Sequence, residues 1–195
     1  MPAAAARDGN NTGLDGWRRW VAGKTGLPLV DAAMRELAAT GYTSNRCRQN
    51  AVSLLVNDLK IDWRLGAEWF QWCLVDHDVS ANWGNWAYFS GVGFDPKARY
   101  FRILSQAKKH DPRAEFIQLW CEELRACETA AEALWPFEGT VAGWPTPVVA
   151  PREHLAWQDR QALDEKGEPE EAEENEEEKN VVVAVVVEES AGGSS

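Results

Sequence analysis

The chain has 195 residues, of which 45% are hydrophobic and 26% charged, so it can bury one sizeable core and a single domain is expected. Its net charge of −11 is concentrated at one end, because residues 161–195 hold 12 of the 31 acidic residues and only two lysines. Residues 1–160 are close to neutral, which leaves a nucleic-acid partner open. Four cysteines without a CxxC pair favour reduced thiols, and no apolar run suits a signal peptide or a membrane span. We expect a soluble, intracellular protein.

Both ends of the chain are predicted to be disordered. Residues 1–15 form a small, polar, glycine-rich leader, and residues 159–195 form an acidic low-complexity tail. The tail contains the valine run 181–187, which has high β propensity but is too short to span a membrane. The folded domain is expected to cover residues 16–158.

Helical patterns follow one another through this domain, and alternating strand patterns are almost absent, so an all-α fold is predicted. The first helix is expected between Pro28 and Gly41, and Ser44 is a candidate N-cap for a second whose apolar face reaches Leu59. Further helices are expected at about 63–75, 79–89, 98–109 and 114–124, followed by an extended surface segment around the prolines at 145, 147 and 151.

A polar cluster lies at the start of the second helix. In the string NRCRQN (45–50), Asn45, Arg48 and Gln49 share one helical face. This face is either a polar wall that could bind a phosphate or a planar heterocycle, or simply a solvated helix start.

A second cluster, Asp76-His77-Asp78, has the spacing that can hold a divalent cation. Because no further ligand is near in sequence, an N-cap role for Asp78 or a buried Asp–Arg pair that uses Arg48 is favoured, and no metal is expected. The tryptophans at 63, 69, 72, 83 and 86 form a third cluster, and most of them are expected in the core.

Four strings, in order, make the chain resemble the photolyase/cryptochrome family over about residues 17–125. They are TGLPLVDAAMRELAATGYTSNR from Thr25, NDLKIDWRLGAEWF from Asn57, LVDHDVSANWGNW from Leu74 and YFRI from Tyr100. Gln49 and Tyr88 stand where duplex-acting cyclobutane photolyases carry methionine and tryptophan, and this pairing resembles the DASH cryptochromes. The resemblance implies the C-terminal part of an all-helical FAD-binding domain.

The resemblance also implies residue roles. The residues implied to bind FAD are Tyr42, Asn45, Arg48, Asp76, Asp78, Ala81 and Asn82. Within this set, Arg48 would pair with Asp76, and Asn82 would face N5 of the flavin. The residues implied to contact DNA or its lesion are Asn45, Arg46, Gln49 and Tyr88. A light-driven electron relay would run from Trp86, nearest the flavin, to Trp63. The basic residues between Lys97 and Arg113 are either a phosphate-facing surface or a solvated helix face.

In a complete protein, the resemblance implies blue-light repair of cyclobutane pyrimidine dimers by a lyase of the deoxyribodipyrimidine photolyase type, with single-stranded DNA preferred. The family's antenna domain is not matched, so no antenna pterin or folate is expected, and a separate N-terminal chain is a candidate partner. No membrane partner is expected. Two alternatives stay open: a blue-light photoreceptor or signalling flavoprotein without repair, and a truncated helical DNA- or protein-interaction module without flavin.

Overall fold

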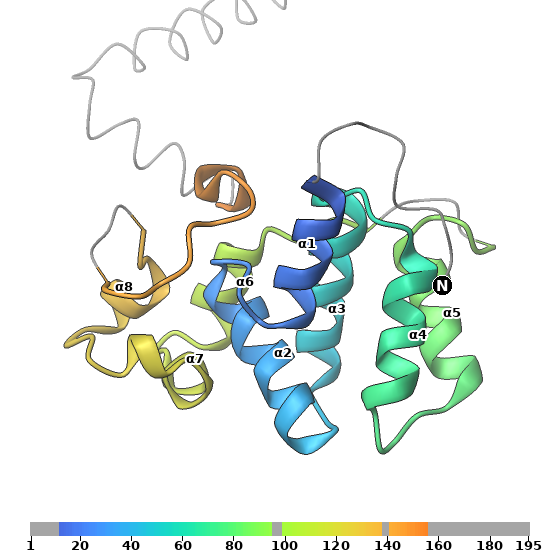
Figure 1. Cartoon of the computed structure of the whole chain (residues 1–195), viewed down its shortest axis with the longest axis horizontal. Helices are drawn as coiled ribbons and strands as arrows, with labels where there is room; N and C mark the ends of the chain where they lie inside the picture. Colours follow the sequence, from blue (N-terminus) through green and yellow to red (C-terminus); the bar gives the residue numbers. More distant parts are fainter. Residues whose placement is uncertain (1–11, 95–98, 138–140, 156–195) are drawn as a thin grey trace, which may run out of the picture. The chain divides into compact units, whose positions relative to one another are not determined.

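The computed structural model describes residues 12–94, 99–137 and 141–155, and within these ranges the chain is helical and contains no strand (Figure 1). The predicted all-α class is therefore confirmed, whereas residues 1–11 and the predicted tail at 159–195 lie outside the described part. The helices are α1 Thr12–Val21, α2 Pro28–Thr40, α3 Asn45–Ser53, the π-helix η1 Leu54–Asp58, α4 Trp63–Cys73, α5 Val79–Phe89, α6 Ile103–His110, α7 Glu115–Trp120, the 3₁₀ helix η2 Glu122–Leu124, α8 Ala130–Leu134 and the 3₁₀ helix η3 Pro151–His154. None of the described helices is long and apolar enough to cross a membrane.

Helix α2 is the centre of the packing, because it contacts α1, α3, α6 and α7. Its limits are those predicted from the sequence: Pro28 occupies the first turn, and Gly41 ends the helix with a φ of +72°. The N–H of Gly41 donates to the carbonyl of Leu37, which satisfies one of the last free carbonyls of the helix. Figure 1 shows α2 beside α3 and α4 beside α5.

Helices α4 and α5 pack closely because Gly66 has no side chain. The indole of Trp86 lies against the backbone of Gly66, where a Cβ would overlap the ring and approach Leu55 to 2.6 Å. Trp86 is also in edge-to-face contact with Phe70 and Trp20, with ring centroids 5.2 and 6.2 Å apart. These contacts join α1, α4 and α5 into one aromatic core.

Helix α1 begins at Thr12, so the prediction of a disordered leader over 1–15 is wrong for its last four residues. Two tryptophans explain the helix: Trp20 is fully buried and donates its indole N–H to the carbonyl of Ala51 at 3.0 Å, and Trp17 stacks on it at 5.5 Å. The i, i+3 spacing of these two residues was the available signal in a segment that otherwise has a loop-like composition.

The second predicted helix does not continue as a regular α-helix after Ser53, but widens into the π-helix η1. Its side chains hold a later segment in place. The hydroxyl of Ser53 accepts the N–H of Phe101 at 2.8 Å, and Asn57 donates to the carbonyl of Arg99 at 2.7 Å. Because residues 99–102 are held by these bonds, α6 begins at Ile103 and not at about residue 98 as predicted.

The helix predicted over 114–124 is divided into α7 and η2, because Cys121 adopts an extended conformation between them. Asp111 starts α7 by accepting the N–H groups of residues 116 and 117 on its carboxylate. Helix α8 was not predicted, although Thr129 and Glu132 form a capping box at its start. The Thr-x-x-Glu spacing is visible in the sequence, but the helix has only five residues.

The segment 141–150 contains no helix or strand, in agreement with the predicted extended segment, but it is bound to the turn between α1 and α2. The N–H of Val148 donates to the carbonyl of Thr25 at 2.8 Å, and the indole of Trp144 donates to that of Gly26 at 3.3 Å. The buried carboxylate of Asp31 holds the same turn by accepting the N–H groups of Thr25 and Gly26 at 2.7 and 2.8 Å.

The last described helix, η3, is anchored by a fully buried imidazole. In His154, Nδ1 accepts the N–H of Ile103 at 3.5 Å, and Nε2 lies 3.5 Å from a carboxylate oxygen of Asp58. Burial, with a smaller contribution from the charge of Arg102, lowers the pKa of His154 to about 4. Burial also raises the pKa of Asp58 to about 6. Below that pH the Asp58 carboxyl is neutral, so it offers no charge to a protonated His154.

Two glycine substitutions test the packing of α4 against α5. We expect Gly66→Ala to lower the free energy of unfolding by about 1–3 kcal/mol, because the new methyl group must displace the Trp86 ring. In the matched substitution Gly84→Ala, in α5, the new methyl group has no atom within 4 Å. This substitution should raise the free energy of unfolding by about 0.5–1 kcal/mol. Urea unfolding followed by tryptophan fluorescence measures both, and equal effects of the two substitutions would contradict the described packing.

The pH dependence of stability tests the His154 anchor. The pKa of His154 is lower in the folded protein than in the unfolded chain. Its burial therefore leaves the free energy of unfolding undiminished above about pH 6.5 and lowers it as the pH falls towards 4. Between these values the free energy of unfolding of the natural chain should fall by up to about 3 kcal/mol relative to that of His154→Phe. Asp31 titrates in both proteins and cancels in the difference, whereas Asp58 lies 3.5 Å from the imidazole, so the difference reports on the His154–Asp58 pair. Parallel stability curves would exclude a buried neutral His154.

Candidate functional site

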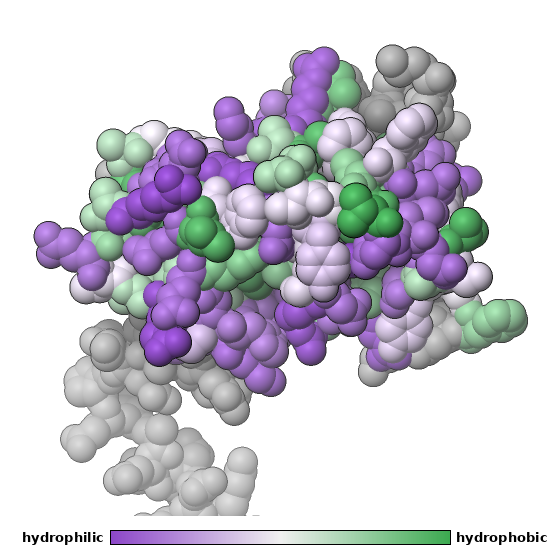
Figure 2. All heavy atoms as spheres, turned by 90° about the horizontal axis from the view of Figure 1, so that it is seen from below, coloured by the Kyte–Doolittle hydropathy of each residue, from purple (hydrophilic) through white to green (hydrophobic). Residues whose placement is uncertain are grey.

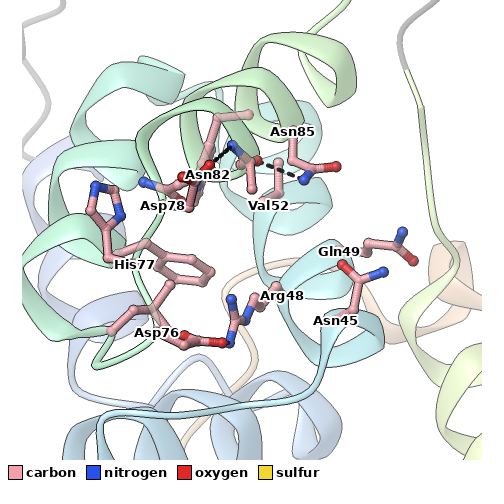
Figure 3. A pocket seen from close by; sticks show the side chains of 13 residues that line it. Asn45, Arg48, Gln49, Val52, Asp76, His77, Asp78, Asn82 and Asn85 are labelled. Atoms are coloured by element: carbon pink, nitrogen blue, oxygen red, sulfur yellow. Dashed lines mark hydrogen bonds and ion pairs between the residues drawn. The ribbon is translucent and has the colours of Figure 1, made fainter.

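A pocket with a cavity volume of about 70 Å³ lies between the start of α3, the end of α4 and the first turns of α5. Figure 3 shows its side chains, which come from these helices and from the loop between α4 and α5. The lining residues are Asn45, Arg48, Gln49, Val52, Phe70, Leu74, Asp76, His77, Asp78, Ala81, Asn82, Asn85 and Trp86. One wall is thus polar and the floor is aromatic and apolar.

The polar wall begins where Ser44 caps α3, accepting the N–H of Cys47 as predicted. Starting the helix there places Asn45, Arg48 and Gln49 on the pocket, as the binding-wall interpretation requires. Within the wall, Arg48 and Asp76 point toward one another (Figure 3), and a guanidinium nitrogen lies 2.9 and 3.0 Å from the two carboxylate oxygens.

Arg48 is held in this position from two other sides. Its Nε donates to the carbonyl of Thr43 at 2.8 Å, and its guanidinium lies 5.4 Å from the centre of the Tyr42 ring. Because the pair with Asp76 is partly exposed, we expect it to contribute less than about 1 kcal/mol to stability. Its clearer effect is to fix the orientation of two charged groups at the mouth of the pocket.

The opposite side of the pocket is built by the start of α5. Asp78 is its N-cap, as predicted, and accepts the N–H of Ala81 at 2.7 Å. Asn82 donates its amide N–H to the carbonyl of Ala67 at 2.9 Å, so its Oδ1 is the atom available to a ligand. Asp76 and Asp78 are therefore engaged in an ion pair and a helix cap, and no group of three metal-ligating side chains occurs among the described residues.

Three polar atoms of residues that line this pocket are shielded from solvent and have no hydrogen-bond partner in the described part of the chain. They are Oε1 of Gln49 and both ring nitrogens of His77. Each buried polar group without a partner costs about 1–3 kcal/mol, and native structures contain few of them. A ligand or a water molecule in the pocket would supply these hydrogen bonds.

The structure brings most of the predicted site residues together at this pocket. Those that line it are Asn45, Arg48, Gln49, Asp76, Asp78, Ala81, Asn82 and Trp86. His77 and Asn85 also line it and were not predicted. The available signal for His77 was its place between the two aspartates, which pointed only to a metal site.

Four predicted residues lie outside the pocket lining. Tyr42 is beneath Arg48, and the guanidinium of Arg46 lies over the ring of Phe101 at 5.6 Å. Tyr88 lies beneath the guanidinium of Arg99, which is 4.7 Å from the ring centre. The fourth, Trp63, packs edge to face against Trp83 at 5.9 Å.

Two arginines of the predicted basic surface between Lys97 and Arg113 make contacts within the protein, and Lys108, Lys109 and Arg113 are exposed. Lys97 lies outside the described residues, and Arg99 covers the ring of Tyr88. Arg102 donates to the backbone carbonyls of Glu153 and Leu155, so it anchors η3. Seen from below the view of Figure 1, the surface in Figure 2 is mostly hydrophilic, with hydrophobic groups separated from one another.

Comparison with known proteins identifies the family. Residues 3–160 match the model of the FAD binding domain of DNA photolyase. A chloroplastic/mitochondrial cryptochrome DASH from Solanum lycopersicum is 57% identical over 118 residues, which are 60% of this chain and 20% of that protein. A cryptochrome DASH from Natronomonas pharaonis is 53% identical over 120 residues, 61% of this chain and 25% of that protein. The chain thus spans about a fifth to a quarter of the length of these relatives.

Solved structures agree with this match. An archaeal photolyase from Sulfolobus tokodaii, crystallised with two FAD molecules, superposes with a TM-score of 0.69 at 33% identity, covering 83% of this chain and 37% of that one. The cryptochrome of Synechocystis sp. PCC6803 superposes with a TM-score of 0.67 at 37% identity, and the match covers 82% of this chain and 34% of that one. With a family match that includes every helix around the pocket, the chain belongs to the photolyase/cryptochrome family, through its FAD-binding domain.

Proposed function

We propose that this chain forms part of the FAD site of a DASH-type cryptochrome, and that the pocket between α3, α4 and α5 contacts the flavin. The observation that carries the proposal is the pair of half-buried residues Gln49 and His77, which line this pocket and have solvent-shielded polar atoms without a partner among the described residues. A flavin offers both ring carbonyl and N–H groups and a hydroxylated chain, so it can satisfy such atoms.

The surrounding residues suit the same ligand. Trp86, which is almost fully buried, supports the apolar floor from below, and Arg48 is held by Asp76 at the mouth. The Oδ1 of Asn82 would accept a hydrogen bond from the N5–H group of a reduced flavin. This contact favours the reduced flavin that repair requires. An amide at this position adds no charge beside the ring.

The size of the pocket limits how much of FAD these residues hold. Sites that enclose a whole ligand of drug size have about 300–1,000 Å³, against a cavity of about 70 Å³ here. We therefore expect the described residues to supply one wall of the site and to bind FAD weakly when alone. A chain that carries the remainder of the family's flavin domain is the proposed partner.

A flavin titration tests the site. We expect saturable quenching of FAD fluorescence by the natural chain, weakened about tenfold or more in Asp76→Ala, which leaves Arg48 unpaired at the pocket mouth. Asn82→Ala should weaken binding about fivefold to tenfold, because one hydrogen bond to the ligand is lost.

The control is Asp15→Ala, which removes an exposed carboxylate from α1, away from the pocket lining. It should bind FAD as the natural chain does. If the natural chain is folded by circular dichroism and shows no saturable binding, or if Asp15→Ala is as weak as Asp76→Ala, the proposed flavin site is refuted.

We further propose that, in the complete protein, this domain takes part in blue-light repair of pyrimidine dimers in single-stranded DNA. When bound and reduced, the flavin would supply the light-excited electron that splits the dimer. Asn45 and Gln49 line the pocket and offer amide groups to a flipped base. Arg46 is exposed and would contact a phosphate. The roles of Tyr88 in lesion contact and of Trp63 in the relay stay predictions.

Dimer loss under blue light is the test of repair. With reduced FAD, the chain and its completing partner should remove dimers faster from single-stranded than from duplex oligonucleotides, because unpairing costs less. Arg46→Ala should weaken DNA binding and reduce the slope of its salt dependence by about one charge. Light-driven change in flavin absorbance without dimer loss would favour the photoreceptor alternative.

A helical interaction module without flavin is the second candidate. It is favoured by three apolar side chains near the loop between α4 and α5, since Trp72, Val75 and Val79 are 87%, 79% and 64% exposed. Binding of DNA or of a protein partner by the FAD-free chain, unchanged in Asp76→Ala, would support this candidate over the flavin site.

A further inference from the structure

Glu36, on helix α2, is connected to the pocket by hydrogen bonds although it does not line it. Its Oε2 accepts a hydrogen bond from the hydroxyl of Thr43 at 2.6 Å, and Thr43 is fully buried in the loop between α2 and α3. An O–H···O bond of this length has the geometry of a charge-assisted hydrogen bond, which is the stronger kind. Glu36 therefore ties this loop to α2.

The backbone of the same loop holds the ion pair at the pocket mouth. The carbonyl of Thr43 accepts the Nε–H of Arg48 at 2.8 Å, so Thr43 contacts α2 through its side chain and Arg48 through its backbone. The carbonyl of Gly41 accepts the N–H of Val75, the residue before Asp76, at 2.9 Å. A loop fixed to α2 thus contributes to the position of both members of the ion pair.

The orientation of Arg48 decides which of its nitrogens faces a ligand. Nε donates to the carbonyl of Thr43, and Nη2 donates to both carboxylate oxygens of Asp76. Nη1 has no partner among the described residues, so it is the guanidinium nitrogen left for a ligand in the pocket that Arg48 lines. Because the guanidinium is planar, fixing two of its nitrogens fixes the direction of the third.

We propose that Glu36 is a positioning residue for the pocket: through the hydroxyl of Thr43 it fixes the carbonyl that holds Arg48, and so it sets the direction of Nη1. Glu36 itself touches no ligand. The orientation of Arg48 is a property of this chain alone, and only its consequence for flavin binding rests on the proposed function. A helix that does not line the pocket thereby controls the geometry of its mouth.

Two substitutions at one position separate the hydrogen bond from the rest of the side chain. Glu36→Gln keeps an oxygen that can accept the hydroxyl of Thr43, whereas Glu36→Met has a similar length and no such acceptor. The exchange of the Arg48 Nε–H with solvent, followed by NMR of the guanidinium nitrogens, reports whether its bond to the loop persists. We expect this exchange to be about fivefold faster in Glu36→Met, the equivalent of one hydrogen bond, and less than about twofold faster in Glu36→Gln.

Arg35 supplies a reference on the same helix. Its Nε–H donates to the carbonyl of Gly23 at 2.9 Å, so its exchange reports on the stability of α2. In both variants this exchange should stay within about twofold of its rate in the natural chain. Equal acceleration at Arg35 and Arg48 in Glu36→Met would mean that the whole helix has loosened, and it would overturn the positioning role.

Flavin binding measures the consequence for the pocket. By quenching of fluorescence, FAD should bind Glu36→Met about threefold to tenfold more weakly than the natural chain, and Glu36→Gln should retain most of the affinity. Thr43→Val removes the hydroxyl and should weaken binding as Glu36→Met does. The double variant should be no weaker than either single variant, because both remove the same hydrogen bond.

The matched control is Glu122→Met, which removes an exposed carboxylate from η2, outside the pocket lining. It changes the net charge as Glu36→Met does, and it should leave both the exchange of Arg48 and the affinity for FAD unchanged. Weakening of FAD binding by both substitutions alike would assign the effect to net charge and overturn the proposal.

The remaining outcomes distinguish the positioning role from the flavin site. Unchanged exchange at Arg48 in Glu36→Met refutes the positioning role, and so does a Glu36→Gln variant that is altered as much as Glu36→Met. Faster exchange at Arg48 alone, where the natural chain binds no flavin, supports the positioning role and refutes the flavin site. Faster exchange at Arg48 with unchanged affinity for FAD overturns the consequence proposed for the pocket.

Discussion

The contact between the Trp86 indole and the bare backbone of Gly66 is the constraint on which the other features of the site depend. It allows α4 and α5 to approach closely, brings Phe70 and Trp20 against the same ring, and gives the pocket its aromatic floor. Because that ring is almost fully buried, the floor is fixed before any ligand binds. The polar wall on α3 can then face a surface that does not move.

Three charged residues line the pocket around this floor. Arg48 donates to the carbonyl of Thr43 and to the carboxylate of Asp76, and Asp78 caps the start of α5. The side chains left for a ligand are the amides of Gln49 and Asn82 and the imidazole of His77. A site of this kind selects by the direction of its hydrogen bonds more than by attraction between charges.

The sequence was sufficient to predict an element wherever a local signal determines it. Helix α2 begins at Pro28 and ends before Gly41, as predicted. The predicted N-caps of α3 and α5, Ser44 and Asp78, are also confirmed, and the motif strings indicated the family. The predicted helix boundaries are wrong where contacts with residues distant in sequence determine them. Helix α1 is stabilised by burial of Trp20, and the late start of α6 depends on Ser53 and Asn57. The pocket's unpartnered nitrogens could not be predicted either, since they depend on what Asp76 and Asp78 bind in three dimensions.

The turn between α1 and α2 is completed by residues that come very late in the chain, since Trp144 binds Gly26 across a separation of 118 residues. Closing so long a loop costs entropy that only the finished contacts repay. During synthesis this turn must remain incomplete until Trp144 has left the ribosome. The order of folding is therefore constrained: α2 can pack with α3 early, while the turn between α1 and α2 gains its final support last.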